Sequence, residues 1–131
     1  MSTLVVSNIN DGTTTVPATY VTNGSAKAWV NFDGTGTIAV RDSKNVSSLT
    51  DNTTGDYYVN FSSSMGNQNY CTLDGTNRET DAFTSNVYTN NATGLYEAPA
   101  TNRFRISTNA GLGSGGRDSK SVNCAVFGDL A

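Results

Sequence analysis

Apolar and polar residues alternate most clearly between residues 26 and 61, where a strand pattern repeats around sharp turns. A period of two residues places Trp29 on one face of the strand predicted over residues 27–32. The opposite face collects the apolar positions Ala28, Val30 and Phe32. Such alternation is typical of a strand with one buried face. This stretch therefore predicts the framework to which the later strands are added.

Two turn signals divide the stretch into further strands. The Asp-Gly-Thr-Gly sequence at residues 33–36 predicts a tight turn, because glycine supplies a positive φ. After a return strand and a polar step at residues 42–45, the spacing of Val46 and Leu49 predicts a bulge or a bend. A second hairpin loop is expected at residues 51–56. The positions predicted to be buried are Val30, Phe32, Ile38, Val40, Tyr57, Val59 and Phe61.

Further strands are predicted along the rest of the chain. Their expected ranges are 69–73, 82–88, 102–108 and 121–128, with a shorter candidate at 94–96. No segment shows a convincing helical period over ten or more positions. Regularly spaced short strands with turn residues between them are typical of a sandwich or barrel. We therefore predict an all-β fold, an antiparallel β-sandwich or jelly-roll-like domain with a short N-terminal arm.

The start of the chain differs from the framework. Leu4, Val6 and Ile9 mark a short first strand with apolar residues on both faces. Asp-Gly, Pro17 and Asn-Gly signals then follow between residues 10 and 25 and predict a linker or arm. The expected division is an N-terminal strand and arm for attachment or oligomerisation (1–25) and a β-sandwich module (26–131).

Composition excludes several classes of function. The chain has 131 residues and no histidine, which removes His-based general base chemistry and the commonest transition-metal ligand. A net charge of −3, with 15% charged residues, argues against the basic surface that nucleic-acid binding needs. Large apolar residues are few for a domain of this length, so a partner chain is expected to cover part of the apolar surface.

The two cysteines lie inside apolar strand patterns, Cys71 in residues 69–73 and Cys124 in residues 121–128. Buried free thiols are the favoured interpretation, because they behave as small hydrophobes. A disulfide between adjacent strands is the alternative. The N-terminal sequence lacks the basic region and apolar run of a signal peptide, and no stretch has membrane-spanning length. We therefore expect synthesis in a cytosol and no membrane partner.

Patterns that could carry chemistry have simpler interpretations. Residues 111–116 match G-x-G-x-x-G, but a strand is predicted after them instead of a helix, which indicates a loop. The acidic residues of 74–81 lack the alternating ligands of an EF-hand loop, which favours a solvated hairpin. Asp51 and Asp56 fall on a turn, where aspartate is favoured for turn chemistry alone. Hydrolysis of a glycan by two carboxylates is the alternative, while we predict no enzyme, metal or cofactor.

Exposed aromatic side chains are the stronger indication of function. Tyr88, Tyr96 and Trp29 lie on or near polar segments, where a ring beside amides and charges suits contact with carbohydrate or protein. Trp29 points away from the apolar face of its strand, in a chain that is short of apolar residues. We therefore interpret Trp29 as a contact between chains.

A series of short phrases runs through the chain in a fixed order. The phrases are AKAWVNF (26–32), GTG (34–36), NVSSLTDN (45–52), GDY (55–57), VNF (59–61), NYC (69–71) and AVFGD (125–129). This series resembles a module of tail-fibre and related virion proteins of tailed phages, many of them marine. The resemblance covers about residues 26–128, with residues 74–118 matched only in character. Residues 4–9 also resemble the short strand that precedes the module in such fibres.

The resemblance implies a virion structural protein, tail-fibre-like or tail-tip-like, that assembles as a homotrimer after synthesis in the host cytoplasm. The module normally ends a longer fibre, so a chain that begins with the short arm suggests a small attached subunit. The loops at 74–81, 88–102 and 109–119 are then expected to face a host glycan or receptor. A capsid decoration or knob protein and a free lectin-like glycan-binding module are the alternatives.

Two sets of candidate residues follow from these expectations. The candidates for receptor binding are Arg78, Asp81, Tyr88, Tyr96 and Arg103. The candidates for the oligomer interface are Leu4, Val6, Ile9 and Trp29. The arm is expected to contact other copies and other virion proteins, and no nucleic acid is expected as a partner.

Overall fold

The computed structural model describes residues 2–77, 87–88, 98–109 and 115–131. Its elements are β1 (Asn8–Asn10), β2 (Thr15–Pro17), α1 (Ala18–Gly24), β3 (Ala28–Asp33), β4 (Ala39–Lys44), β5 (Val46–Thr53), β6 (Asp56–Phe61), β7 (Cys71–Asn77), β8 (Val87–Tyr88), β9 (Arg103–Thr108) and β10 (Ser121–Phe127). Within these ranges, no helix is long and apolar enough to cross a membrane.

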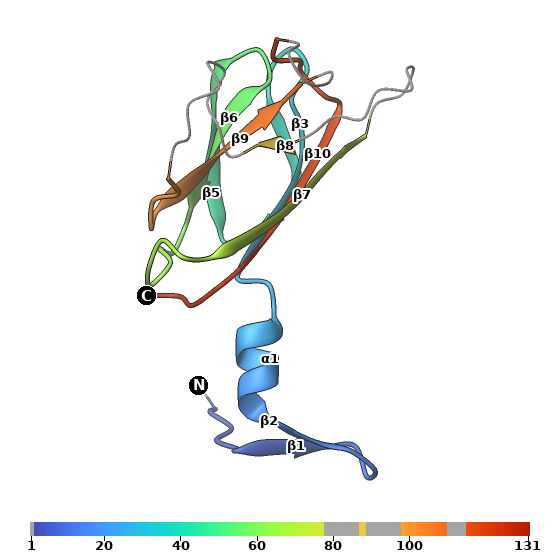
Figure 1. Cartoon of the computed structure of the whole chain (residues 1–131), viewed down its shortest axis with the longest axis vertical. Helices are drawn as coiled ribbons and strands as arrows, with labels where there is room; N and C mark the ends of the chain where they lie inside the picture. The colour runs from blue at the N-terminus through green and yellow to red at the C-terminus, as the bar shows by residue number, and fades with distance from the viewer. Residues whose placement is uncertain (1, 78–86, 89–97, 110–114) are drawn as a thin grey trace.

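Strands β3 to β10 form two antiparallel sheets that pack face to face (Figure 1). The first sheet has the strand order β4-β3-β10-β7, and the second has the order β5-β6-β9-β8. The last strand of the chain, β10, therefore pairs with β3, the first strand after the arm. The predicted all-β fold is confirmed: the chain forms an antiparallel β-sandwich with a short N-terminal arm.

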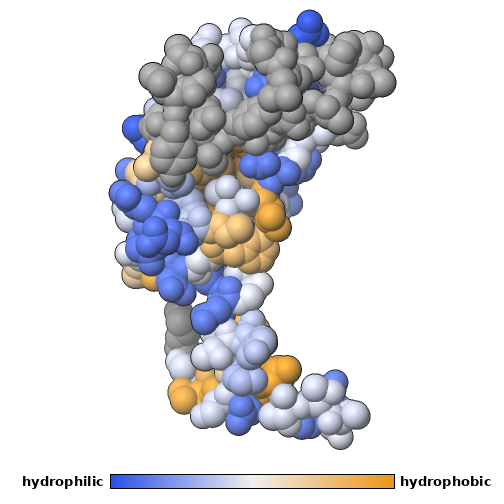
Figure 2. Space-filling view, in the orientation of Figure 1, coloured by the Kyte–Doolittle hydropathy of each residue, from blue (hydrophilic) through white to orange (hydrophobic). Residues whose placement is uncertain are grey.

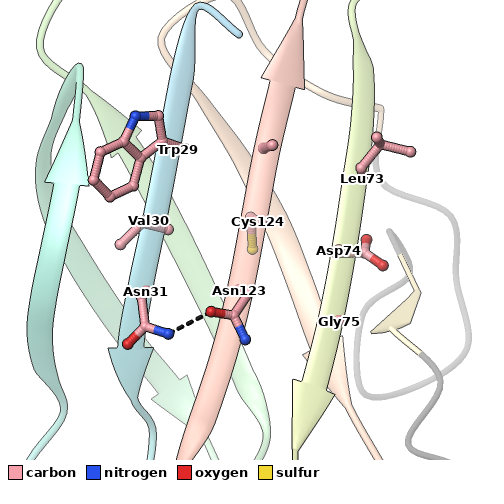
Figure 3. A pocket seen from close by; sticks show the side chains of 9 residues that line it. Trp29, Val30, Asn31, Leu73, Asp74, Gly75, Asn123 and Cys124 are labelled. Carbon is pink, nitrogen blue, oxygen red and sulfur yellow. Dashed lines mark hydrogen bonds between the residues drawn. The ribbon is translucent and has the colours of Figure 1, made fainter.

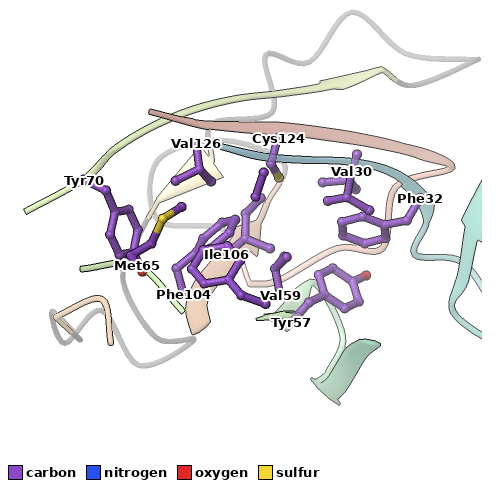
Figure 4. Close-up of a cluster of buried hydrophobic side chains, with 13 residues drawn as sticks. Val30, Phe32, Tyr57, Val59, Met65, Tyr70, Phe104, Ile106, Cys124 and Val126 are labelled. Carbon is purple, nitrogen blue, oxygen red and sulfur yellow. The ribbon is translucent and has the colours of Figure 1, made fainter. Parts of the chain in front are cut away.

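Alternate side chains of the central strands meet between the two sheets and form the core (Figure 4). The ring of Phe32, from the first sheet, meets the ring of Tyr57, from the second, edge to face at a centroid distance of 5.2 Å. Edge-to-face contacts of this kind stabilise a core beyond the burial of apolar area. The predicted positions that are buried are Val30, Phe32, Tyr57, Val59 and Phe61.

The prediction was wrong for Val40, whose side chain is 45% exposed. Val40 lies on β4, an edge strand that is exposed along most of its length. A register shift in the β3–β4 ladder falls next to the pair of Phe32 and Val40, and a bulge increases the local twist of a strand. The edge strand is therefore only partly covered, and Ile38, in the turn before it, packs partly buried against the core.

The chain passes from the first sheet to the second through a single residue, Asn45, between β4 and β5. Asn45 has a φ of 55°, in the left-handed region that asparagine tolerates better than most residues. Its side chain accepts a hydrogen bond from the Ser63 N–H (2.7 Å) and donates one to the Ser63 carbonyl (3.1 Å). These two bonds hold the link, and the bulge or bend predicted from Val46 and Leu49 is confirmed by the register shift between Val46 and Ser48 in the β5–β6 ladder.

The arm lies at one end of the sandwich and consists of the β1–β2 hairpin followed by α1 (Figure 1). The helix α1 forms two turns directly after Pro17, and none of its residues is buried. Seven residues are too few to show a helical period in the sequence.

The strand predicted around Leu4, Val6 and Ile9 begins later in the structure. Strand β1 begins at Asn8, and residues 2–6 lie outside any strand.

The cysteines differ in their surroundings, and both are free. Cys124 is buried and faces the core, which confirms one of the two predicted buried thiols. Cys71 is exposed, because it lies opposite Phe127 on the outer face of the first sheet. The two residues are three register positions apart on neighbouring strands, so the alternative disulfide does not form. Burial, and secondarily the charge of Asp74, raise the pKa of the Cys124 thiol above its usual value.

We predict that a thiol reagent such as Ellman's reagent labels Cys71 but not Cys124 in the native protein. The thiolate is the reactive form, and burial keeps Cys124 protonated and out of reach. The native protein should therefore release one equivalent of chromophore per chain, and the denatured protein two. The variant Cys71→Ser is the control and should show almost no native labelling. Two equivalents from the native wild-type protein would contradict the arrangement.

Candidate functional site

The outer face of the first sheet carries a row of apolar side chains across three strands. The antiparallel register places Ala125 of β10 between Trp29 of β3 and Leu73 of β7. Side chains that are directly opposite each other in neighbouring strands lie on the same face of a sheet. Leu73 is 58% exposed, and Trp29 and Ala125 are partly exposed. These three residues line a groove across the sheet, with Trp29 and Leu73 on the two outer strands of the three (Figure 3).

The next row along the same strands supplies the polar side of the groove. Asn123 of β10 lies opposite Asn31 of β3 and Gly75 of β7. The Asn31 amide donates a hydrogen bond to Oδ1 of Asn123, as Figure 3 shows. A Cβ atom at Gly75 would meet nothing within 4 Å, so the absent side chain leaves this part of the surface open. The groove is shallow and open to solvent, with a volume of about 410 Å³.

Arg41 and Asp33 lie at the border of this groove and pair with each other. Nη1 of Arg41 lies 3.4 Å from Oδ1 of Asn31, while its Nη2 pairs with Asp33 at 2.9 Å. Asp74 is the charged residue among those that line the groove. Its side chain still reaches solvent, but desolvation by the surrounding protein raises the pKa of its carboxyl group. The groove is therefore lined mostly by apolar groups and neutral amides.

A second candidate surface is the apolar part of the arm, which we call the arm surface. Leu4 and Val5 are 84% and 87% exposed. The other large apolar side chains exposed on the arm are Val6, Ile9, Tyr20 and Val21. Orange residues gather near the foot of the molecule in Figure 2, where the arm lies. Several large exposed apolar side chains on one short segment indicate contact with another protein.

A third cluster lies on the outer face of the second sheet, around Tyr58. The guanidinium of Arg103 lies over the Tyr58 ring at 4.0 Å, and that of Arg105 lies 5.4 Å from the ring centre. Arg105 is held by an ion pair with the buried Asp56, and its Nε donates to Oδ1 of that carboxylate over 2.7 Å. Arg103 is exposed and contacts Tyr58 by a cation–π interaction. In this cluster Asp56 holds Arg105, while Arg103 is exposed to solvent.

A buried polar cluster joins the two sheets at the end away from the arm. The Tyr57 hydroxyl donates to the Asp118 carboxylate over 2.6 Å and lies 3.2 Å from the Gly34 carbonyl. The same carboxylate accepts a bond from the Gly55 N–H at 2.7 Å. Burial, and then the bond to Asp118, raise the pKa of the Tyr57 phenol far above its usual value. A phenol that stays protonated is a donor here and not a base, so the cluster is structural.

The structure places the predicted oligomer residues on two separate surfaces. Leu4, Val6 and Ile9 all belong to the arm surface, whereas Trp29 lies on the sandwich, in the groove. The interface role of these four residues stays a prediction. Sequence reasoning missed Tyr20 and Val21, because the helix that carries them was not expected.

Among the predicted receptor-binding residues, Arg103 lies in the cluster around Tyr58. Tyr88 is placed only by its backbone, which pairs with Ser107. Arg78, Asp81 and Tyr96 lie outside the described residues. The receptor-binding role of all five residues stays a prediction.

The neighbours of Trp29 were also missed by the sequence. Alternation in β10 places Asn123 and Ala125 on the outer face, but nothing in the sequence indicates that this strand lies beside β3. Among the described residues, no group of three His, Cys, Asp or Glu side chains is placed to hold a metal ion. Of the loop predicted at 111–116, residues 111–114 lie outside the described residues, Gly116 forms an isolated bridge with Asn109, and β10 is the next regular element.

Comparison with known proteins adds no relative for this chain. No known protein family, no curated protein and no solved structure matches it. The function has to be argued from the groove, the arm surface and the resemblance to virion modules.

We predict that Tyr57→Phe lowers the free energy of unfolding by about 1–3 kcal/mol, because the Asp118 carboxylate loses a buried donor. Denaturant unfolding followed by circular dichroism measures the change. Tyr20→Phe is the control, since Tyr20 is an exposed residue of the arm and its substitution should have almost no effect. Equal stability of Tyr57→Phe and the wild-type protein would show that the cluster does not hold the two sheets.

Proposed function

We propose that the chain is a structural subunit of a tailed-phage virion, tail-fibre-like or tail-tip-like, that assembles as a homotrimer through its arm. The observation that carries the proposal is the arm surface, which lies outside the sandwich with its apolar side chains exposed. The resemblance of residues 26–128 to virion modules supports the phage assignment and the number of copies. No enzymatic activity is part of this proposal.

The arm surface needs a partner for physical reasons. Leu4, Val5 and Val6 precede any strand, and the helix α1 that follows the hairpin buries none of its residues. An isolated hairpin and a helix of two turns are marginal in water without packing against other elements. Further copies of the same arm offer the same apolar residues and would cover them. The arm is thus ordered most readily as part of an assembly.

The arrangement of the sandwich suits a subunit that is attached at one end. Strand β3 begins directly after the arm and runs away from it, so the turn between β3 and β4 lies at the far end (Figure 1). The turn between β5 and β6 joins it there, because Tyr57 and Gly34 are in contact. An arm that docks onto other virion proteins would present this far end outward. We infer from this placement a contribution to adsorption on the host surface.

Two alternatives remain open to experiment. A capsid decoration or knob protein would use the same arm on a different part of the particle. A free lectin-like module is favoured by the groove beside Trp29, and it would not need the arm. The expected location is the virion, after synthesis in the host cytoplasm, with no nucleic acid or membrane as a partner.

We predict that the double variant Leu4→Asp, Val6→Asp changes the trimer into a monomer. Burying two unpaired carboxylates in an apolar interface makes the free energy of association less favourable by roughly several kcal/mol. A small interface cannot offset this loss. Light scattering coupled to size-exclusion chromatography measures the mass. The matched control is Val40→Asp, because Val40 is 45% exposed on the sandwich and Val6 is 44% exposed on the arm. A monomeric wild-type protein at micromolar concentration would refute the assembly.

We also predict that a chain without residues 1–25 stays folded but no longer associates with phage particles. The sandwich has its own core, and the arm contributes no residue to it. Circular dichroism tests the fold, and co-sedimentation with particles tests the attachment. Particle association that survives the deletion would exclude an attachment role for the arm.

A further inference from the structure

The groove beside Trp29 combines features that a solvent-facing sheet surface has no structural need for. The Trp29 indole and the Leu73 side chain flank Ala125 from the strands on either side, and two hydrogen-bonded amides lie in the next row of the same face. Known ligand sites are mostly apolar hollows of about 300–1,000 Å³ with a few placed polar groups. The groove, at about 410 Å³, lies within this range.

The amides of Asn31 and Asn123 keep donors and acceptors for a ligand. An amide side chain has two N–H donors and two acceptor positions on its oxygen. In the described part of the chain, the Asn123 amide donates to the Ser121 hydroxyl at 3.3 Å and accepts from Asn31. Since Asn31 also accepts one bond, from Arg41, one N–H and one acceptor position of each amide remain among these contacts. Arg41, at 3.4 Å, orients the Asn31 amide from its other side.

We propose that this groove binds a neutral pyranose unit of a host surface glycan. The C–H face of a pyranose ring packs on an aromatic ring, and its hydroxyl groups both donate and accept hydrogen bonds, as the two amides require. Asp74 is the charged residue of the lining, and it lies opposite Cys124 on the inner face of the sheet, so the outward side chains of the lining are uncharged and a neutral sugar fits. Gly75 leaves room for the sugar beside Asn123.

A second copy of the chain is the competing occupant, and the polar row argues against it. An apolar partner, such as the arm of another copy, would cover the two amides without using their free donors. A buried donor without a partner costs about 1–3 kcal/mol. The hydroxyl groups of a sugar avoid this cost. The proposal rests on the adsorption role in the proposed function, but its test measures sugar binding and does not depend on assembly.

The test is a titration of the full-length protein with methyl glycosides of glucose, galactose, mannose and N-acetylglucosamine, followed by tryptophan emission. Trp29 is the one tryptophan of the chain, so its emission reports on the groove alone. We expect a saturable change of emission with at least one of these neutral sugars, and a weaker change with glucuronic acid. Absence of any saturable change, or stronger binding of the acidic sugar, would overturn the proposal.

Two variants connect the binding to this groove. Gly75→Val adds a branched side chain beside Asn123 in open space on a strand, where valine is well tolerated. Asn123→Ala removes one of the two amides. Each variant should weaken sugar binding at least about tenfold, the equivalent of one lost hydrogen bond. Binding that is unchanged in both variants would place the sugar elsewhere and refute the assignment.

A control variant and a dissociation experiment complete the design. Gly115→Val also fills open space, outside the groove lining, and should bind sugar as the wild-type protein does. If Trp29 emission shifts to the red when the assembly dissociates before unfolding, a second copy covers the groove and the proposal fails. A monomeric protein that binds sugar would refute the assembly and leave the groove assignment intact.

Discussion

The register between β3 and β10 determines both the interior and the outer surface of the first sheet. Cys124 lies opposite Val30 and faces the core, so Ala125 has to lie opposite Trp29 on the outside. A slip of one residue would bring Trp29 into the core and Val30 into solvent, because side chains alternate with a period of two. The apolar interior therefore also specifies which side chains surround the groove.

The end of the sandwich away from the arm is held by polar contacts of Asp118 and requires a glycine at position 55. The Asp118 carboxylate joins the Tyr57 hydroxyl to the Gly55 N–H across the two sheets. Gly55 has a φ of 69°, and a Cβ atom there would lie 2.3 Å from the Thr108 carbonyl. Only glycine combines this conformation with so little space. The sandwich is thus closed by its own residues, whereas the arm surface lacks comparable cover in the described chain. This contrast distinguishes the sandwich, which has its own core, from the arm, whose apolar side chains stay exposed.

The strength of the alternation decided how well each element could be predicted. The strand 27–32 and the positions Tyr57, Val59 and Phe61 were predicted correctly, because each has one clearly apolar face. Val40 has the same apolar character but lies on an edge strand, and alternation does not reveal which strand is at an edge. Cys71 was misjudged for a related reason, since its face of β7 is the outer one. The helix α1 has two turns and no buried face, so it leaves no periodic pattern in the sequence.

The sequence by itself determined the all-β class, the turns after β3 and β5, the core positions of β3 and β6 and the outward direction of Trp29, because these follow from the order of neighbouring residues. Only the tertiary structure decided what lies beside Trp29. Asn31 and Asn123 are 92 residues apart in the chain, and their hydrogen bond depends on β10 returning to pair with β3. Gly75 joins them through a further strand pairing. A groove made by three strands is a property of their order and register, and no single stretch of sequence contains that information.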